Sequence, residues 1–94
     1  MKIFLSFLQK LTALQELYLY NTRVLGNIEN LRNLTGLKYL ALSSTGALGY
    51  IDALVHLLFL EVAKLRGTAV SGWISSAWNG QCQKLRELDL GARG

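Results

Sequence analysis

The chain has 94 residues, 51% of them hydrophobic, and a formal net charge of +4, which fits one domain or a piece of one. This composition is too apolar for a disordered chain. The sequence contains no run of 18 apolar residues, so it predicts no transmembrane helix. Its single cysteine, Cys82, and single histidine, His56, exclude an intrachain disulfide and a zinc site of cysteine and histidine ligands.

Residues of the same kind recur every 23 positions along the chain. The three columns of identical residues are Thr22, Thr45 and Thr68, then Gly26, Gly49 and Gly72, then Ile28, Ile51 and Ile74. Apolar columns keep the same interval, and they begin with Leu8, Leu11, Leu14, Leu17 and Leu19. A repeat of this length predicts a solenoid. Because the first eight residues are already in register, we expect them to belong to the fold rather than to a signal peptide.

The leucines at the start of the chain recur every three residues, from Leu5 to Leu17. On an α-helix each step of three residues turns this stripe back by about 60°. The leucines would therefore leave one face within four steps, which argues against a long amphipathic helix. A coil that turns a corner every few residues accounts for the spacing. A two-residue insertion after Ile74 restores the register for the last coil.

The unit L-x-x-L-x-x-L-x-L-x-x-T-x-V-x-G-x-I resembles the leucine-rich repeat over essentially the whole chain. Its first copy consists of Leu11, Leu14, Leu17, Leu19, Thr22, Val24, Gly26 and Ile28. The Gly-x-Ile element is similar to the plant-type, receptor-like subclass, with threonine in place of the usual asparagine and no proline. The resemblance implies an α/β solenoid of about four 23-residue coils, with a short parallel sheet on the concave face and helical or 3₁₀ turns on the convex face.

The Leu-x-Leu segments predict the strands of this sheet. We place the strands near residues 16–20, 39–43, 62–66 and 87–91. Each threonine is expected to turn its hydroxyl inward, where it can bond backbone groups in the turn that follows the strand. Each glycine of the repeated column is expected to mark a second bend, where a side chain would crowd the next coil.

Side chains alternate along a strand, so the variable positions between the leucines face the concave surface. The candidate partner-binding residues are Glu16, Tyr18, Tyr20, Tyr39, Ser43, Lys64, Arg66, Glu87 and Asp89. The three tyrosines favour a binding hot spot, with cross-strand packing as the alternative. The charged residues predict either a surface charge ladder of low energetic value or an electrostatic binding patch.

Several residues outside the strands also carry predictions. Tyr50 and Trp73 share one column, so their rings are expected to stack along one flank of the solenoid. Trp78 is expected to fill the space made by the two-residue insertion. Asn33 begins an Asn-Leu-Thr glycosylation sequon on the convex side, and Cys82 replaces a core leucine as a small apolar residue.

These features predict a non-catalytic interaction module that binds a protein or peptide partner on the concave strand face. The alternative is a purely structural spacer segment of a larger receptor-like protein. No nucleophile and base can pair, because His56 is on the convex side and Cys82 is in the core. We therefore expect no enzyme activity, no cofactor and no metal. The ten basic residues are scattered over every repeat, so we expect no nucleic-acid partner and no membrane contact by this segment.

The organisation of the chain is predicted from its terminal coils, which carry no polar caps. We expect residues 1–94 to form a single leucine-rich-repeat domain that continues into further repeats as a fragment of a longer array. End-to-end self-association is the alternative. The Gly-x-Ile element favours an extracellular or membrane-tethered location over a cytoplasmic one.

Overall fold

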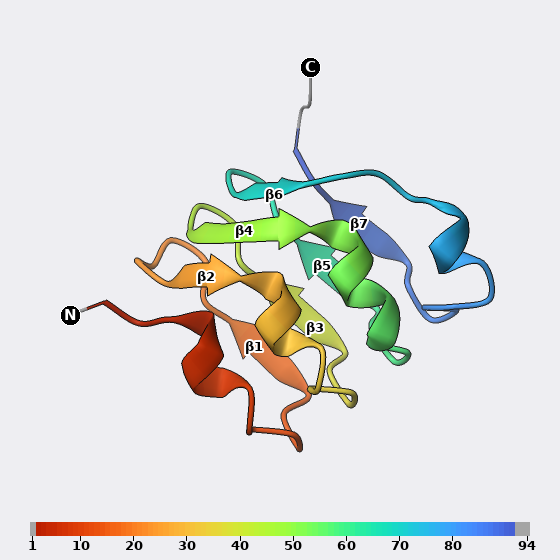
Figure 1. The fold of residues 1–94 in the computed structure, drawn as a ribbon, viewed down its shortest axis with the longest axis horizontal. Helices are drawn as coiled ribbons and strands as arrows, with labels where there is room; N and C mark the ends of the chain where they lie inside the picture. The colour runs from red at the N-terminus through yellow and green to blue at the C-terminus, as the bar shows by residue number, and fades with distance from the viewer. Residues whose placement is uncertain (1, 92–94) are drawn as a thin grey trace.

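In the computed structural model, which describes residues 2–91 apart from the side chain of Ala77, the chain winds through successive coils that stack side by side (Figure 1). The first sheet has the order β1-β3-β5-β7 and consists of β1 (Glu16–Tyr18), β3 (Tyr39–Ala41), β5 (Val62–Lys64) and β7 (Glu87–Asp89). All of its strand pairs are parallel. The predicted solenoid with a parallel concave sheet is therefore confirmed.

Short 3₁₀ helices return the chain on the convex side. They are η1 (Leu5–Leu8), η2 (Ile28–Leu31), η3 (Ile51–His56) and η4 (Ser76–Trp78). The first three begin at the same position of the repeat, whereas η4 begins two residues later because of the insertion. Within residues 2–91, no helix combines the length and the apolarity that a membrane crossing would require.

The repeat interval fixes the register of the concave sheet. Leu17 pairs with Leu40 and Leu40 with Ala63, at the predicted spacing, and Ala63 pairs with Leu88 across the insertion. Each strand starts where predicted but is two residues shorter. Single backbone bonds prolong the contact, since the Leu19 amide donates to the Ala41 carbonyl at 2.8 Å. The chain then turns through a left-handed residue, for example Ser44 with φ of 56°.

A second parallel sheet lies on the flank of the solenoid and was not predicted. It has the order β2-β4-β6 and consists of β2 (Leu25–Asn27), β4 (Gly46–Tyr50) and β6 (Ala69–Ser71). Gly26 and Gly49 lie inside its strands, with φ of 120° and 109°. The expected bend is therefore wrong at these two positions, whereas Gly72 follows the end of β6. A Cβ at Gly26 or Gly49 would crowd a neighbouring coil, but this is the preceding coil and not the next one as expected. A Cβ on Gly26 would lie 3.3 Å from the Leu5 nitrogen of the preceding coil.

The leucine and isoleucine columns converge between the two sheets and the 3₁₀ helices to form the core. Leu5, Ile28 and Ile51 are completely buried, but Ile74, in the same column, is 53% exposed. Trp78 enters the core in this last coil and is only 7% exposed, as expected for a residue that fills the space of the insertion. Cys82 is buried too, and burial raises the pKa of its thiol.

The threonine column stabilises the turn after each concave strand. The Thr45 hydroxyl donates to the Leu42 carbonyl at 2.7 Å and accepts a bond from the Ala47 amide at 3.3 Å. Thr22 and Thr68 repeat both bonds in their own coils. Each hydroxyl thus acts as donor and acceptor within one coil, as the sequence predicted.

Replacing Thr45 by valine is expected to lower the free energy of unfolding by about 1–3 kcal/mol, because two backbone groups of the turn lose their partner. Urea unfolding followed by circular dichroism measures this change. Thr35→Val is the matched control, since Thr35 is exposed and lies in a turn on the convex side. Equal effects of the two substitutions would show that the bonds of Thr45 contribute nothing.

Candidate functional site

The concave sheet carries a hollow with a volume of about 740 Å³. Its lining residues are Tyr18, Tyr20, Asn21, Tyr39, Leu40, Ala41, Ser43, Ser44, Val62, Lys64, Arg86 and Glu87. The hollow thus brings together six of the candidate residues, including the three tyrosines. The other three candidates, Glu16, Arg66 and Asp89, do not line it.

The tyrosines present large aromatic surfaces to this hollow. Tyr18 is 53% and Tyr20 is 57% exposed, whereas Tyr39 on the neighbouring strand is half-buried. The Tyr18 hydroxyl donates to Glu16 Oε1 at 3.1 Å. Partial desolvation and then this bond to a carboxylate raise the pKa of Tyr18.

Arg86 is a lining residue that the sequence analysis missed. It precedes β7 and reaches across β5, so that its guanidinium donates to the Tyr39 hydroxyl at 3.1 Å and lies 5.9 Å from the centroid of the Tyr39 ring. Its Nε is 3.6 Å from Glu61 Oε1. The bond to Tyr39 and the charge of Glu61 raise the pKa of Arg86.

A sequence signal for Arg86 does exist. The position before each strand is polar in all four coils, where it is occupied by Gln15, Lys38, Glu61 and Arg86. Strict alternation would turn this position inward, but such polar side chains are rarely buried. Because the residue before the strand is polar in every coil, the sequence could have predicted that Arg86 is exposed, although alternation alone would have turned it inward.

The charged residues at the β5–β7 end form ion pairs. Lys64 Nζ is 3.9 Å from Glu87 Oε2, and Arg66 is 3.3 Å from Asp89 Oδ1. A backbone bond from Gly91 and the contact with Arg66 lower the pKa of Asp89. Exposed pairs of this kind are worth about 0–1 kcal/mol. These pairs match the predicted surface charge ladder, because Lys64 and Arg66 each have a carboxylate of the next strand beside them.

Two predicted features lie away from the concave sheet. Asn33 and Thr35 of the sequon are exposed in the turns that follow η2. Tyr50 and Trp73 do not stack, so that expectation is wrong. Among residues 2–91 the rings in contact are those of Phe4 and Phe7, whose centroids are 5.7 Å apart, whereas Tyr50 and Trp73 line a separate pocket.

Comparison with known proteins rests on solved structures. No family model and no curated protein matches the sequence. The chain is similar to the leucine-rich-repeat ectodomain of the plant membrane receptor kinase GASSHO1/SCHENGEN3 from Arabidopsis thaliana, in a complex with CASPARIAN STRIP INTEGRITY FACTOR 2. The identity is 32% and the TM-score is 0.76, over 90% of this chain. The chain has the leucine-rich-repeat fold.

A leucine-rich-repeat protein of Leptospira interrogans shows the same fold, with 22% identity and a TM-score of 0.67 over 89% of this chain. The present leucine-rich-repeat chain spans 10% of the plant ectodomain chain and 27% of the Leptospira protein. The similarity to the plant ectodomain agrees with the resemblance to plant-type leucine-rich repeats that the Gly-x-Ile element indicated.

Proposed function

We propose that this leucine-rich-repeat chain is a non-catalytic recognition segment that binds a protein or peptide partner on its concave sheet. The hollow lined by Tyr18, Tyr20 and Tyr39 is the observation that carries the proposal. Tyrosine is enriched among residues that dominate binding energy, because it offers a rigid apolar ring with a polar tip. The similar plant ectodomain, solved in complex with CASPARIAN STRIP INTEGRITY FACTOR 2, supports the assignment.

The contacts of Arg86 add a reason to expect selective binding. Its bond to the Tyr39 hydroxyl holds the phenol in one orientation before any partner arrives. Side chains that are ordered in advance lose less conformational entropy on binding. The ion pairs of Lys64 and Arg66 would then border the aromatic centre as a neutralised polar rim.

The proposal includes the setting of the chain. We propose that residues 1–94 form one leucine-rich-repeat segment of a longer array, outside the cell or tethered to its surface. The similarity to one tenth of a receptor ectodomain supports this setting. Under it, the exposed sequon at Asn33 is a glycan acceptor. The second candidate function is a structural spacer, in which other repeats of the array bind the partner.

A displayed peptide library screened against the chain tests the concave site. For peptides selected on the wild type, the Tyr18→Ala/Tyr39→Ala variant is expected to bind more than about 30-fold more weakly, because truncated hot spots cost at least about 2 kcal/mol. Circular dichroism must show that the variant is folded. The matched control is Leu58→Ala/Phe59→Ala, which removes exposed apolar side chains outside the hollow.

The two candidate functions give different results in this experiment. Loss of affinity in the tyrosine variant alone supports concave recognition. Loss in the control variant alone would place the binding surface elsewhere and contradict the proposal. A library that yields no binder to the wild-type chain would favour the spacer.

A further inference from the structure

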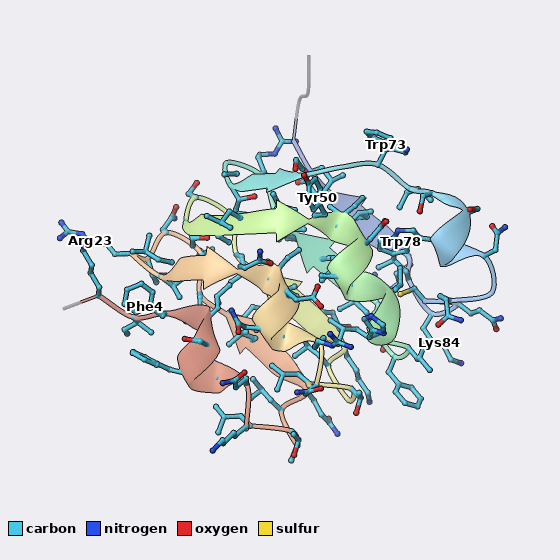
Figure 2. All side chains as sticks on the ribbon, in the orientation of Figure 1. Phe4, Arg23, Tyr50, Trp73, Trp78 and Lys84 are labelled. Atoms are coloured by element: carbon cyan, nitrogen blue, oxygen red, sulfur yellow. The ribbon has the colours of Figure 1, made fainter. Side chains whose placement is uncertain are left out.

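A second pocket lies on the flank sheet, at the point where β4 and β6 end. It has a volume of about 320 Å³ and is lined by Tyr50, Asp52, Ser71, Gly72, Trp73 and Ser75. Figure 2 shows Trp73 projecting outward from the segment that follows β6, while Tyr50 lies at the end of β4. This pocket shares no lining residue with the concave hollow, so a ligand bound there would be independent of the proposed function.

Two uncovered aromatic rings dominate the pocket. Trp73 is 78% and Tyr50 is 72% exposed, the highest values among the exposed large hydrophobic side chains of residues 2–91. Gly72 also lines the pocket, and a Cβ added to it would be 3.7 Å from Tyr50 Cδ1. Because glycine has no side chain, no Cβ covers this edge of the Tyr50 ring. The rings are therefore free to contact a group from outside the chain.

The carboxylate of Asp52 is held at a fixed place in the same pocket. The indole Nε1 of the buried Trp78 donates to Asp52 Oδ1 at 2.9 Å, and the Ser75 hydroxyl lies 3.4 Å from both carboxylate oxygens. These donors are neutral, and Oδ2 keeps room for further hydrogen bonds, since a carboxylate can accept about four. The anion is thus oriented without being neutralised.

Asp52 differs in this respect from most acidic residues of the chain. Glu29, Glu61, Glu87 and Asp89 each have an arginine or lysine nitrogen within 4.0 Å. No cationic nitrogen of residues 2–91 lies within that distance of Asp52. In Figure 2 the labelled cations Arg23 and Lys84 lie well away from Tyr50 and Trp73. The pocket therefore combines an uncompensated negative charge with two aromatic faces.

Such a combination suits a guanidinium group. Its plane stacks on the faces of tryptophan and tyrosine, and its fork of N–H donors pairs with a carboxylate. A neutral ring could stack on Trp73 but would leave the carboxylate of Asp52 without a counter-ion. The net charge of +4 does not prevent approach, because charges beyond about 8 Å are largely screened at physiological ionic strength.

We propose that the pocket between Tyr50 and Trp73 binds an arginine side chain of a protein partner, with Asp52 as its counter-ion. The flank sheet is then a second contact surface of the solenoid. The volume of about 320 Å³ suits one long side chain, and the partner approaches from the open side of the two rings.

The test is an NMR titration of the 94-residue chain with the peptide acetyl-Gly-Arg-Gly-amide. Trp73 and Trp78 are the only tryptophans, so the spectrum has two indole N–H signals, which Trp73→Phe assigns. The Trp73 signal is expected to shift saturably. The peptide with citrulline, the uncharged isostere of arginine, is expected to bind at least about tenfold more weakly.

Variants identify the groups responsible. Asp52→Asn keeps an oxygen acceptor for the Trp78 indole but removes the charge, and it is expected to lower affinity for the arginine peptide to that for the citrulline peptide. Glu29→Gln is the matched control, because Glu29 occupies the same repeat position one coil earlier, and it is expected to change nothing. Tyr50→Ala is expected to weaken binding without shifting the unfolding transition.

Three results would overturn the proposal. They are the absence of a saturable Trp73 shift with the arginine peptide, equal affinity for the arginine and citrulline peptides, and unchanged affinity in Asp52→Asn. None of them bears on the concave tyrosines, whose variants are expected to bind the arginine peptide as the wild type does.

Discussion

Replacing Trp78 by alanine is expected to lower the free energy of unfolding by about 3–5 kcal/mol, the usual cost of truncating a large buried aromatic side chain. The side chain is 7% exposed and packs in the coil where Ile74 has left the core. Its removal leaves a cavity beside the neighbouring coil, and Asp52 loses the indole donor at 2.9 Å. Urea unfolding followed by far-ultraviolet circular dichroism gives the value.

The other tryptophan provides the control for this prediction. Trp73 is 78% exposed, so Trp73→Ala is expected to change the free energy of unfolding by less than about 0.5 kcal/mol. Both variants lose one indole, so composition and spectroscopic background stay comparable. If Trp78→Ala were as stable as Trp73→Ala, Trp78 would not be the residue that fills the space of the insertion.

Replacing Gly49 by alanine is the second substitution with a large expected cost. Its φ of 109° is strained for any residue with a Cβ, which costs about 1–3 kcal/mol. The new methyl group would also contact the side-chain amide of Asn27 on β2. Asn27 is exposed and can move away, but it then gives up the Glu29 amide that its side chain caps at 2.8 Å. Because loss of such a cap adds about 0.5–2 kcal/mol, we expect a total loss of about 2–4 kcal/mol, measured as a lower urea midpoint.

Gly80 separates the two contributions to this loss. Its φ of 75° is also positive, but no atom lies within 4 Å of a Cβ built on it. Gly80→Ala is therefore expected to cost about 1–2 kcal/mol from backbone strain alone. Equal losses at the two glycines would show that the close approach of Asn27 to Gly49 is not part of the effect.

The concave half of the fold was predictable because one interval governs it. The spacing of Leu17, Leu40 and Ala63 sets the strand register directly, and the insertion after Ile74 was visible as a break in that spacing. The flank sheet was not predictable in the same way. Two of its three strands, β2 and β4, contain glycine in place of an alternating apolar pattern, and its partners, such as Leu25 and Gly46, do not share a repeat column.

The part of the candidate site that lies on the strands was predictable, because side chains alternate along a strand. Alternation places Tyr18, Tyr20 and Tyr39 on the concave face, and they line its hollow. It says nothing of Asn21 and Ser44, which follow the strands in left-handed conformations and border the hollow from the turn. It also cannot foresee that the long side chain of Arg86 spans a whole strand to reach Tyr39.

The pairing of β5 with β7 has a practical consequence. The return path between them is two residues longer than in the other coils, yet the concave strands pair as directly as β1 and β3 do. The pairing of the concave strands therefore does not depend on the length of the return path. The exposed turn at Asn79 and Gly80, with open space around Gly80, is accordingly a permissive position, where a fluorophore or an affinity tag can be inserted while the opposite face keeps its shape.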